Sequence, residues 1–158
     1  MKDNPSEIYI KLAKRLDALP AGFPPTPDGV EIQILQKLFS EEEANLALHL
    51  TLLSEGVRAI AFRAGQPQDQ VASQLSEMAN KGLISSSNSQ GKTPTYAISQ
   101  FVVGFYEDQV NRLDAELAVL FEAYAPTYFR EGPWNKLPQI RTIPINESIP
   151  LTSEVMHY

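Results

Sequence analysis

The chain of 158 residues contains no cysteine. This excludes disulfide bonds, thiolate catalysis, cysteine-ligated zinc and conventional iron–sulfur clusters within the chain itself. Its two histidines, His49 and His157, have no second histidine or cysteine at ligand spacing, and a metal site needs three or four converging ligands. We therefore expect no catalytic, cofactor-binding or metal-binding residues here, and we expect a protein that is not an enzyme.

No part of the sequence is basic. The formal net charge is -6, and residues 1–66, 67–100 and 101–158 carry about -2, 0 and -4 of it. Proteins that follow a nucleic-acid backbone need clustered Lys and Arg to neutralise phosphates. This charge distribution argues against DNA as a partner.

Long apolar runs are also missing. No stretch approaches the roughly 18 residues that a membrane span needs, and the N-terminus lacks the basic-then-apolar layout of a signal peptide. With 43% hydrophobic residues the chain is globular. We expect a cytoplasmic protein that makes no use of a membrane.

Start and stop signals of helices are frequent in the first half of the chain. Ser40 and Glu43 match the S-x-x-E capping box, and Gly65 and Gly82 stand where left-handed C-caps end helices. Phe23, in a proline-rich connector, is expected to anchor that connector on the core. The pattern predicts five helices, over residues 4–19, 30–39, 40–53, 56–65 and 66–82.

Two short alternating stretches follow, at residues 83–87 and 95–99, and they predict two strands joined by a turn. Two helices and such a hairpin form the back half of a winged helix-turn-helix. We therefore expect a mostly α (α+β) fold: a winged helix with additional N-terminal helices, a long C-terminal helix and an extended proline-rich tail.

The long helix is predicted over residues 101–124, with one apolar side formed by Val103, Val110, Leu113, Leu117, Leu120, Phe121 and Tyr124. Such a helix suits a homodimer through residues 101–125, or docking to another domain. The division we expect is a winged-helix-like domain over 1–125 and an extended strap over 126–158, with a possible edge strand at 139–143. The strap is too apolar to be left uncovered.

DNA binding is the main alternative to a scaffold role. In a winged helix the exposed face of the 66–82 helix reads DNA, and the candidates there and on the wing are Gln70, Ser73, Gln74, Lys81 and Lys92. Two lysines neutralise few phosphates. A DNA-binding regulator should shift duplex DNA in a salt-dependent way, and loss of both lysines should weaken that shift.

Other candidate groups have simpler interpretations. Arg58 and Arg63 flank an apolar helix, and salt bridges with the acidic helix start at Glu41–Glu43 are favoured over anion binding. Several aromatic residues cluster on and after the predicted long helix. They are expected to pack in the core or at an interface rather than to line the ligand pocket of a small-molecule sensor: Phe101, Phe105, Tyr106, Phe121, Tyr124, Tyr128 and Phe129.

Four segments in order carry a family resemblance: "RLDALPAGFPPTPDGVEIQILQKLFSEEEANLALHL", "FRAGQPQDQVASQLSEMANKGLI", "AISQFVVGFYEDQVNRLDAELAVLFEAY" and "LPQIRTIPINESIP". They resemble the N-terminal region of prokaryotic 4Fe-4S ferredoxin-type proteins. In that family a winged-helix-like region precedes a part whose C-x-x-C-x-x-C-x-x-x-C-P runs hold the clusters.

This sequence has none of those cysteines, so no cluster ligand can be assigned to any of its residues. The resemblance implies 4Fe-4S clusters in a missing downstream region, and the apolar end of the chain favours a fragment over a natural cluster-free relative. It implies a non-catalytic interaction or scaffold module of an electron-transfer protein. The expected partner is the chain's own iron–sulfur domain or a redox partner protein.

Overall fold

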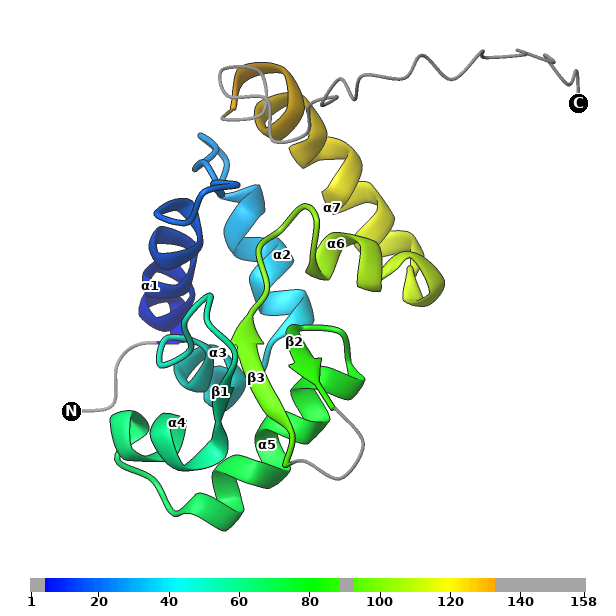
Figure 1. The fold of residues 1–158 in the computed structure, drawn as a ribbon. Helices are drawn as coiled ribbons and strands as arrows, with labels where there is room; N and C mark the ends of the chain where they lie inside the picture. Colours follow the sequence, from blue (N-terminus) through cyan, green and yellow to red (C-terminus); the bar gives the residue numbers. More distant parts are fainter. Residues whose placement is uncertain (1–4, 89–92, 133–158) are drawn as a thin grey trace, which may run out of the picture.

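The structure is a computed structural model that describes residues 5–88 and 93–132. This part is mostly helical with one small antiparallel sheet, so the α+β class is confirmed (Figure 1). Its elements are, in order, α1 (Pro5–Asp17), α2 (Val30–Leu38), α3 (Glu41–Ala47), β1 (Glu55–Gly56), α4 (Val57–Ala64), α5 (Gln68–Asn80), β2 (Ile84–Ser87), β3 (Thr95–Ile98), α6 (Phe105–Asp108), the 3-10 turn η1 (Val110–Arg112), α7 (Ala115–Ala125) and the π-helix η2 (Pro126–Glu131).

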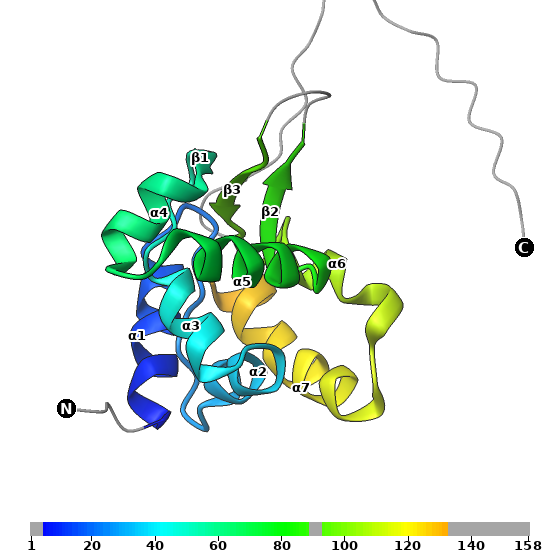
Figure 2. The ribbon, with the colours of Figure 1, turned by 90° about the horizontal axis from the view of Figure 1, so that it is seen from below.

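The sheet has three strands in the order β1-β3-β2, and both pairings are antiparallel. Ile84 lies opposite Ile98, and Glu55 lies opposite Tyr96. Helix α5 packs against both α4 and β2, and Figure 2 shows α4 and α5 side by side. The α4, α5 and sheet elements form one end of the molecule, while α2 and α7 pack together towards the other end.

The local signals at helix ends act as the sequence predicts. The Ser40 side chain accepts a hydrogen bond from the backbone N–H of Glu43, whose carboxylate accepts the N–H of Ser40 in return. Gly65 and Gly82 both have positive φ, at 63° and 71°, and end α4 and α5. The predicted hairpin is confirmed in β2 and β3.

Aromatic rings fill the core between α1, α2 and α7. Phe23 is 1% exposed and lies against the rings of Phe101, Phe105 and Tyr124, with ring centroids 5.1 to 6.1 Å apart. The Tyr128 hydroxyl donates to the carbonyl of Ala21 at 3.1 Å. The prediction that Phe23 anchors its connector is confirmed, and so is core packing of most of the aromatic residues.

The predicted long helix is wrong. The chain turns at 101–104 and then forms α6, η1 and α7 as three separate pieces. Gly104 begins α6, where its N–H donates to the Glu107 carboxylate, and Asp114 caps α7 through the N–H of Leu117. Phe101 and Phe105 turn inward instead, so three residues of the predicted apolar side are exposed: Val103, Val110 and Leu113.

Two other boundaries differ from the predictions. Helix α3 ends at Ala47 rather than near residue 53, and the following segment leads into the unpredicted strand β1. Residues 126–131 continue α7 as a π-helix with a fully buried Tyr128, so the extended strap does not begin at 126. The predicted edge strand at 139–143 lies outside the described residues. No helix of the described part is both long and apolar enough to cross a membrane.

Candidate functional site

The sequence predicts that, if the chain binds DNA, the exposed face of α5 makes the contacts. Gln70 and Ser73 are exposed on α5, and Gln74 is half-buried. Lys81 follows the last turn, with its ammonium 2.7 Å from a carboxylate oxygen of Glu43. Lys92 lies outside the described residues.

The ion pair of Lys81 ties α5 to α3. Glu43 is 6% exposed and holds the α3 cap as well, so its carboxylate bridges two elements. A buried carboxylate that lost its cation would cost stability, because its charge would remain in a desolvated position. Lys81 therefore has a structural partner, and α5 offers no unpaired cation of its own to a phosphate.

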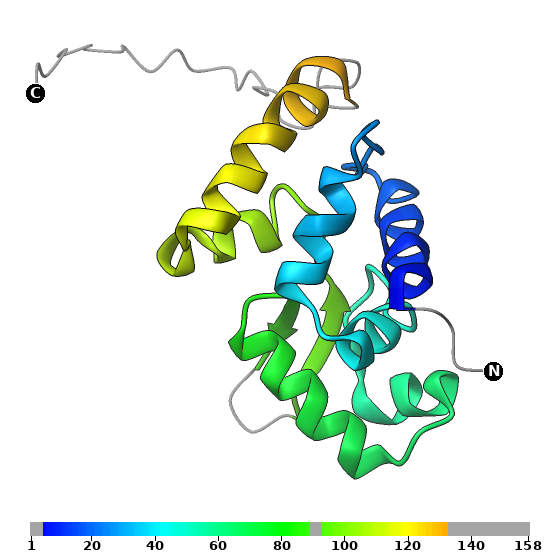
Figure 3. The same cartoon turned by 180° about the vertical axis from the view of Figure 1, so that it is seen from behind.

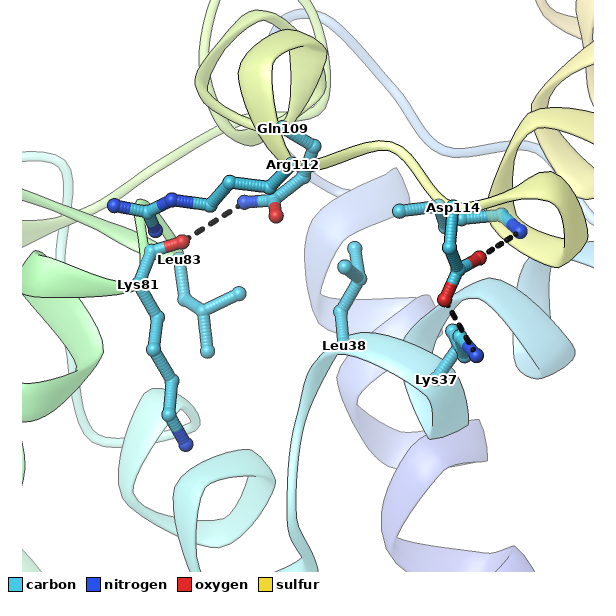
Figure 4. Close-up of a pocket in the computed structure, with 8 residues that line it drawn as sticks. Lys37, Leu38, Lys81, Leu83, Gln109, Arg112 and Asp114 are labelled. Carbon is cyan, nitrogen blue, oxygen red and sulfur yellow. Dashed lines mark hydrogen bonds and ion pairs between the residues drawn. The ribbon is translucent and has the colours of Figure 1, made fainter.

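A small cavity of about 210 Å³ lies where α2, α5, η1 and α7 meet (Figure 4). Apolar side chains and three cations line it, but internal contacts hold each cation. Lys37 lies 2.9 Å from Asp114 and 2.5 Å from Glu116, and Arg112 donates to the Asn80 carbonyl. The residues that line this cavity form the contact between the two ends of the molecule, and we call that contact the seam.

Hydrogen bonds across the seam hold the end of α5. The side-chain amide of Gln109, which is 4% exposed, donates to the carbonyl oxygen of Lys81 at 2.9 Å. The pKa of Asp114 is lowered, first by the N–H of Leu117 and then by the ammonium of Lys37. Hydrogen bonds to the carboxylates of Glu116 and then Asp114 raise the pKa of Lys37. These groups are stabilised in their charged forms by each other.

The outer surface of α4 has a different character. Phe62 is 88% exposed, the most exposed of the large hydrophobic side chains in the described part. With Gly56, Arg58 and Ala59 it lines a shallow hollow of about 520 Å³. Arg58 and Phe62 are four residues apart and so lie on one face of the helix. We call these four residues the α4 surface.

An ion pair fixes α4 in place beside this surface. The guanidinium of Arg63 holds both carboxylate oxygens of Glu55, at 2.8 and 2.6 Å, and its Nε donates to the His49 carbonyl at 2.9 Å. This pairing lowers the pKa of Glu55, with help from the Thr51 hydroxyl, and raises that of Arg63. Burial, and then Arg63, lowers the pKa of His49.

The prediction that Arg63 forms a salt bridge is confirmed, but its partner is Glu55 and not the acidic start of α3. No ion pair with α3 involves Arg58 in residues 5–88 and 93–132 either. Two leucines just before β1 are also exposed, Leu52 at 46% and Leu53 at 77%. The sequence predicts that both leucines belong to a helix. Because α3 ends at Ala47, they follow the helix instead and are exposed.

The described residues contain no group of three or more His, Asp or Glu side chains placed to hold a metal ion. Comparisons of the chain with protein-family models, with curated proteins and with solved structures found no match.

Proposed function

We propose that this chain is a non-catalytic interaction module, built on a winged helix, that docks a partner protein through the α4 surface. The observation that carries this proposal is the 88% exposure of Phe62 beside Arg58. Aromatic side chains, Phe among them, and Arg are enriched at protein interfaces relative to the rest of the surface. Burial of this ring by a partner would remove apolar surface from water, which stabilises a complex by about 25 cal/mol per Å².

The winged-helix part of the proposal rests on chain order. The elements follow one another as β1, α4, α5, β2 and β3, with β3 in the centre of the sheet and α5 packed on β2. That order and packing support a helix-turn-helix followed by a wing. The paired Lys81 favours a protein partner over DNA for this unit.

The partner proposed here has an apolar surface with a carboxylate opposite Arg58. The guanidinium is exposed, and a carboxylate matches its planar donors. The resemblance to ferredoxin-type proteins names the partner class: the chain's own iron–sulfur domain or a redox partner.

Affinity isolation from the native host tests the docking surface. Wild-type protein, a Phe62→Ser variant and a Val110→Ser variant would be expressed with the same tag, and associated proteins quantified by mass spectrometry. Both substitutions remove an exposed apolar side chain, so each is expected to change stability by no more than about 0.5 kcal/mol. A partner retained by wild type and Val110→Ser but lost from Phe62→Ser supports the proposal. Equal retention by all three refutes it.

The electron-transfer part is tested separately, by the intact mass and visible spectrum of the endogenous protein purified without oxygen. A longer, brown, cysteine-containing polypeptide is the expected result. A colourless protein that ends at Tyr158 would contradict the iron–sulfur assignment and leave the α4 surface to be explained alone.

A further inference from the structure

Helix α7 is apolar on both of its sides. Leu117, Phe121 and Tyr124 face inward and are buried against the core. The outward side carries small or apolar side chains that are exposed, with Val119 at 64%: Ala115, Ala118, Val119 and Ala123. A helix that is hydrophobic all round is normally covered on all sides.

No described element covers this outward side. Figures 1 and 3 both show α7 at the edge of the molecule, with α2 and α6 on one side of it only. Two carboxylates border the exposed apolar strip, Glu116 at one end and Glu122 near the middle. Glu116 reaches Lys37, whereas Glu122 has no ion pair among residues 5–88 and 93–132.

The segment 133–145 of the same chain has the complementary chemistry. It contains the apolar residues Trp134, Leu137, Ile140, Ile143 and Ile145. Its only charged residues are Lys136 and Arg141, and both are cations. A second copy of α7 would instead add two more carboxylates to a strip that already carries two, so charge favours the segment over a second copy.

The segment also has the right length. Gly132 follows η2, and at 1.5 Å per residue Glu122 and Glu116 lie about 15 Å and 24 Å back along the helix. Extended chain at about 3.3 Å per residue covers these distances in about five and seven residues. Val119 lies about 20 Å back, which extended chain covers in about six residues. Counted from Gly132, the segment therefore brings Lys136 near Glu122, Leu137 and Pro138 near Val119, and Arg141 within side-chain reach of Glu116.

We propose that residues 133–145 fold back along the outward side of α7, antiparallel to it, and cover Val119. Lys136 then pairs with Glu122, and Leu137 and Ile140 bury the exposed apolar strip. The four prolines from 133 to 150 suit a strap that pairs with no sheet, since proline donates no backbone hydrogen bond. This inference is independent of the α4 surface.

The only tryptophan of the chain, Trp134, lies in the segment and reports on it directly. The full chain is expected to show tryptophan emission blue-shifted from that of N-acetyltryptophanamide in the same buffer. A Val119→Lys variant is expected to lose most of that shift, because it places a cation beneath a basic apolar segment. Phe62→Lys makes the same change on the α4 surface and is expected to keep the shift. An unshifted wild type, or a Val119→Lys variant with wild-type emission, overturns the proposal.

Disulfide trapping gives a second measurement that does not depend on Trp134. Because the chain has no cysteine, a Val119→Cys and Leu137→Cys pair introduces the only thiols. The pair is expected to form a disulfide within a monomer under mild oxidation, at least tenfold faster than a Phe62→Cys and Leu137→Cys pair. Equal rates for the two pairs overturn the proposal. Disulfides found only in dimers overturn it as well and assign the strip to the segment of a second copy.

Discussion

Replacement of Gly82 by alanine tests how the two ends of the molecule are joined. Gly82 ends α5 with φ at 71°, where its N–H donates to the carbonyl of Ala79 and the N–H of Leu83 donates to that of Met78. This is the Schellman arrangement that favours glycine. A Cβ atom built on Gly82 would lie 2.6 Å from the Cβ of Asp108 in α6, which is closer than two carbon atoms can approach.

Gly65 supplies the matched control. It ends α4 with φ at 63°, but a Cβ atom there would have nothing within 4 Å. Alanine at either site destabilises the folded state by about 1–2 kcal/mol, because the backbone there is left-handed. Alanine also stiffens the unfolded chain, which offsets about 0.4–1 kcal/mol of that cost. Gly65→Ala should therefore lower the free energy of unfolding by about 1 kcal/mol. At Gly82 the clash adds roughly 1–3 kcal/mol of overpacking, so Gly82→Ala should lose about 2–4 kcal/mol.

Urea denaturation followed by circular dichroism measures both free energies of unfolding, with unchanged m-values as the test of a two-state comparison. A Gly82→Ala and Asp108→Gly double variant should recover part of the excess loss, because it removes the Cβ atom that clashes. If Gly82→Ala and Gly65→Ala lower the free energy of unfolding equally, α6 does not pack on the end of α5, and the contact inferred between the two ends of the molecule is wrong.

Two further predictions concern single side chains. Ser40→Ala should lower the free energy of unfolding by about 1 kcal/mol through loss of the capping box, whereas Ser76→Ala, on an exposed position of α5, should lower it by much less; equal effects in denaturation would contradict the cap. The pKa of Tyr124 is raised, mainly by burial, far above the usual value of about 10, so its neutral form is favoured in the folded state. The stability it contributes is complete below pH about 10 and is lost as pH rises above it. Tyr124→Phe should therefore leave the amplitude of the reversible tyrosinate absorbance titration of the folded protein unchanged, and loss of one tyrosine's amplitude would contradict that burial.

Local chemistry made several elements predictable from the sequence. The capping box of Ser40 and Glu43 and the terminal glycines Gly65 and Gly82 act within a few residues, so their effects do not depend on the rest of the fold. The hairpin of β2 and β3 was equally visible in its alternating residues. Such signals fix where elements begin and end, but not how the elements pack.

The region after residue 100 shows the limit of periodicity. Apolar residues recur there at helical spacing, yet Val103 and Val110 are exposed, while Phe101 and Phe105 pack on Phe23 from a chain segment almost 80 residues earlier. Only tertiary packing decides between these two apolar sets. The break did have a local signal: Gly104 precedes Glu107 by three residues, and Asp114 precedes the next helix as an N-cap.

Ion pairs between distant residues could not be predicted at all, and they decide what the surface offers to a partner. Lys81 holds Glu43, Arg63 holds Glu55 and Lys37 holds two carboxylates, so cations that a nucleic-acid surface would need serve the fold instead. Exposed carboxylates such as Glu122 remain on a chain with a net charge of -6. The negative net charge disfavours binding of a polyanion. It does not weaken an apolar contact at Phe62 or Val119, because burial of apolar area does not depend on net charge. The exposed apolar side chains, rather than α5, are therefore where binding should be sought.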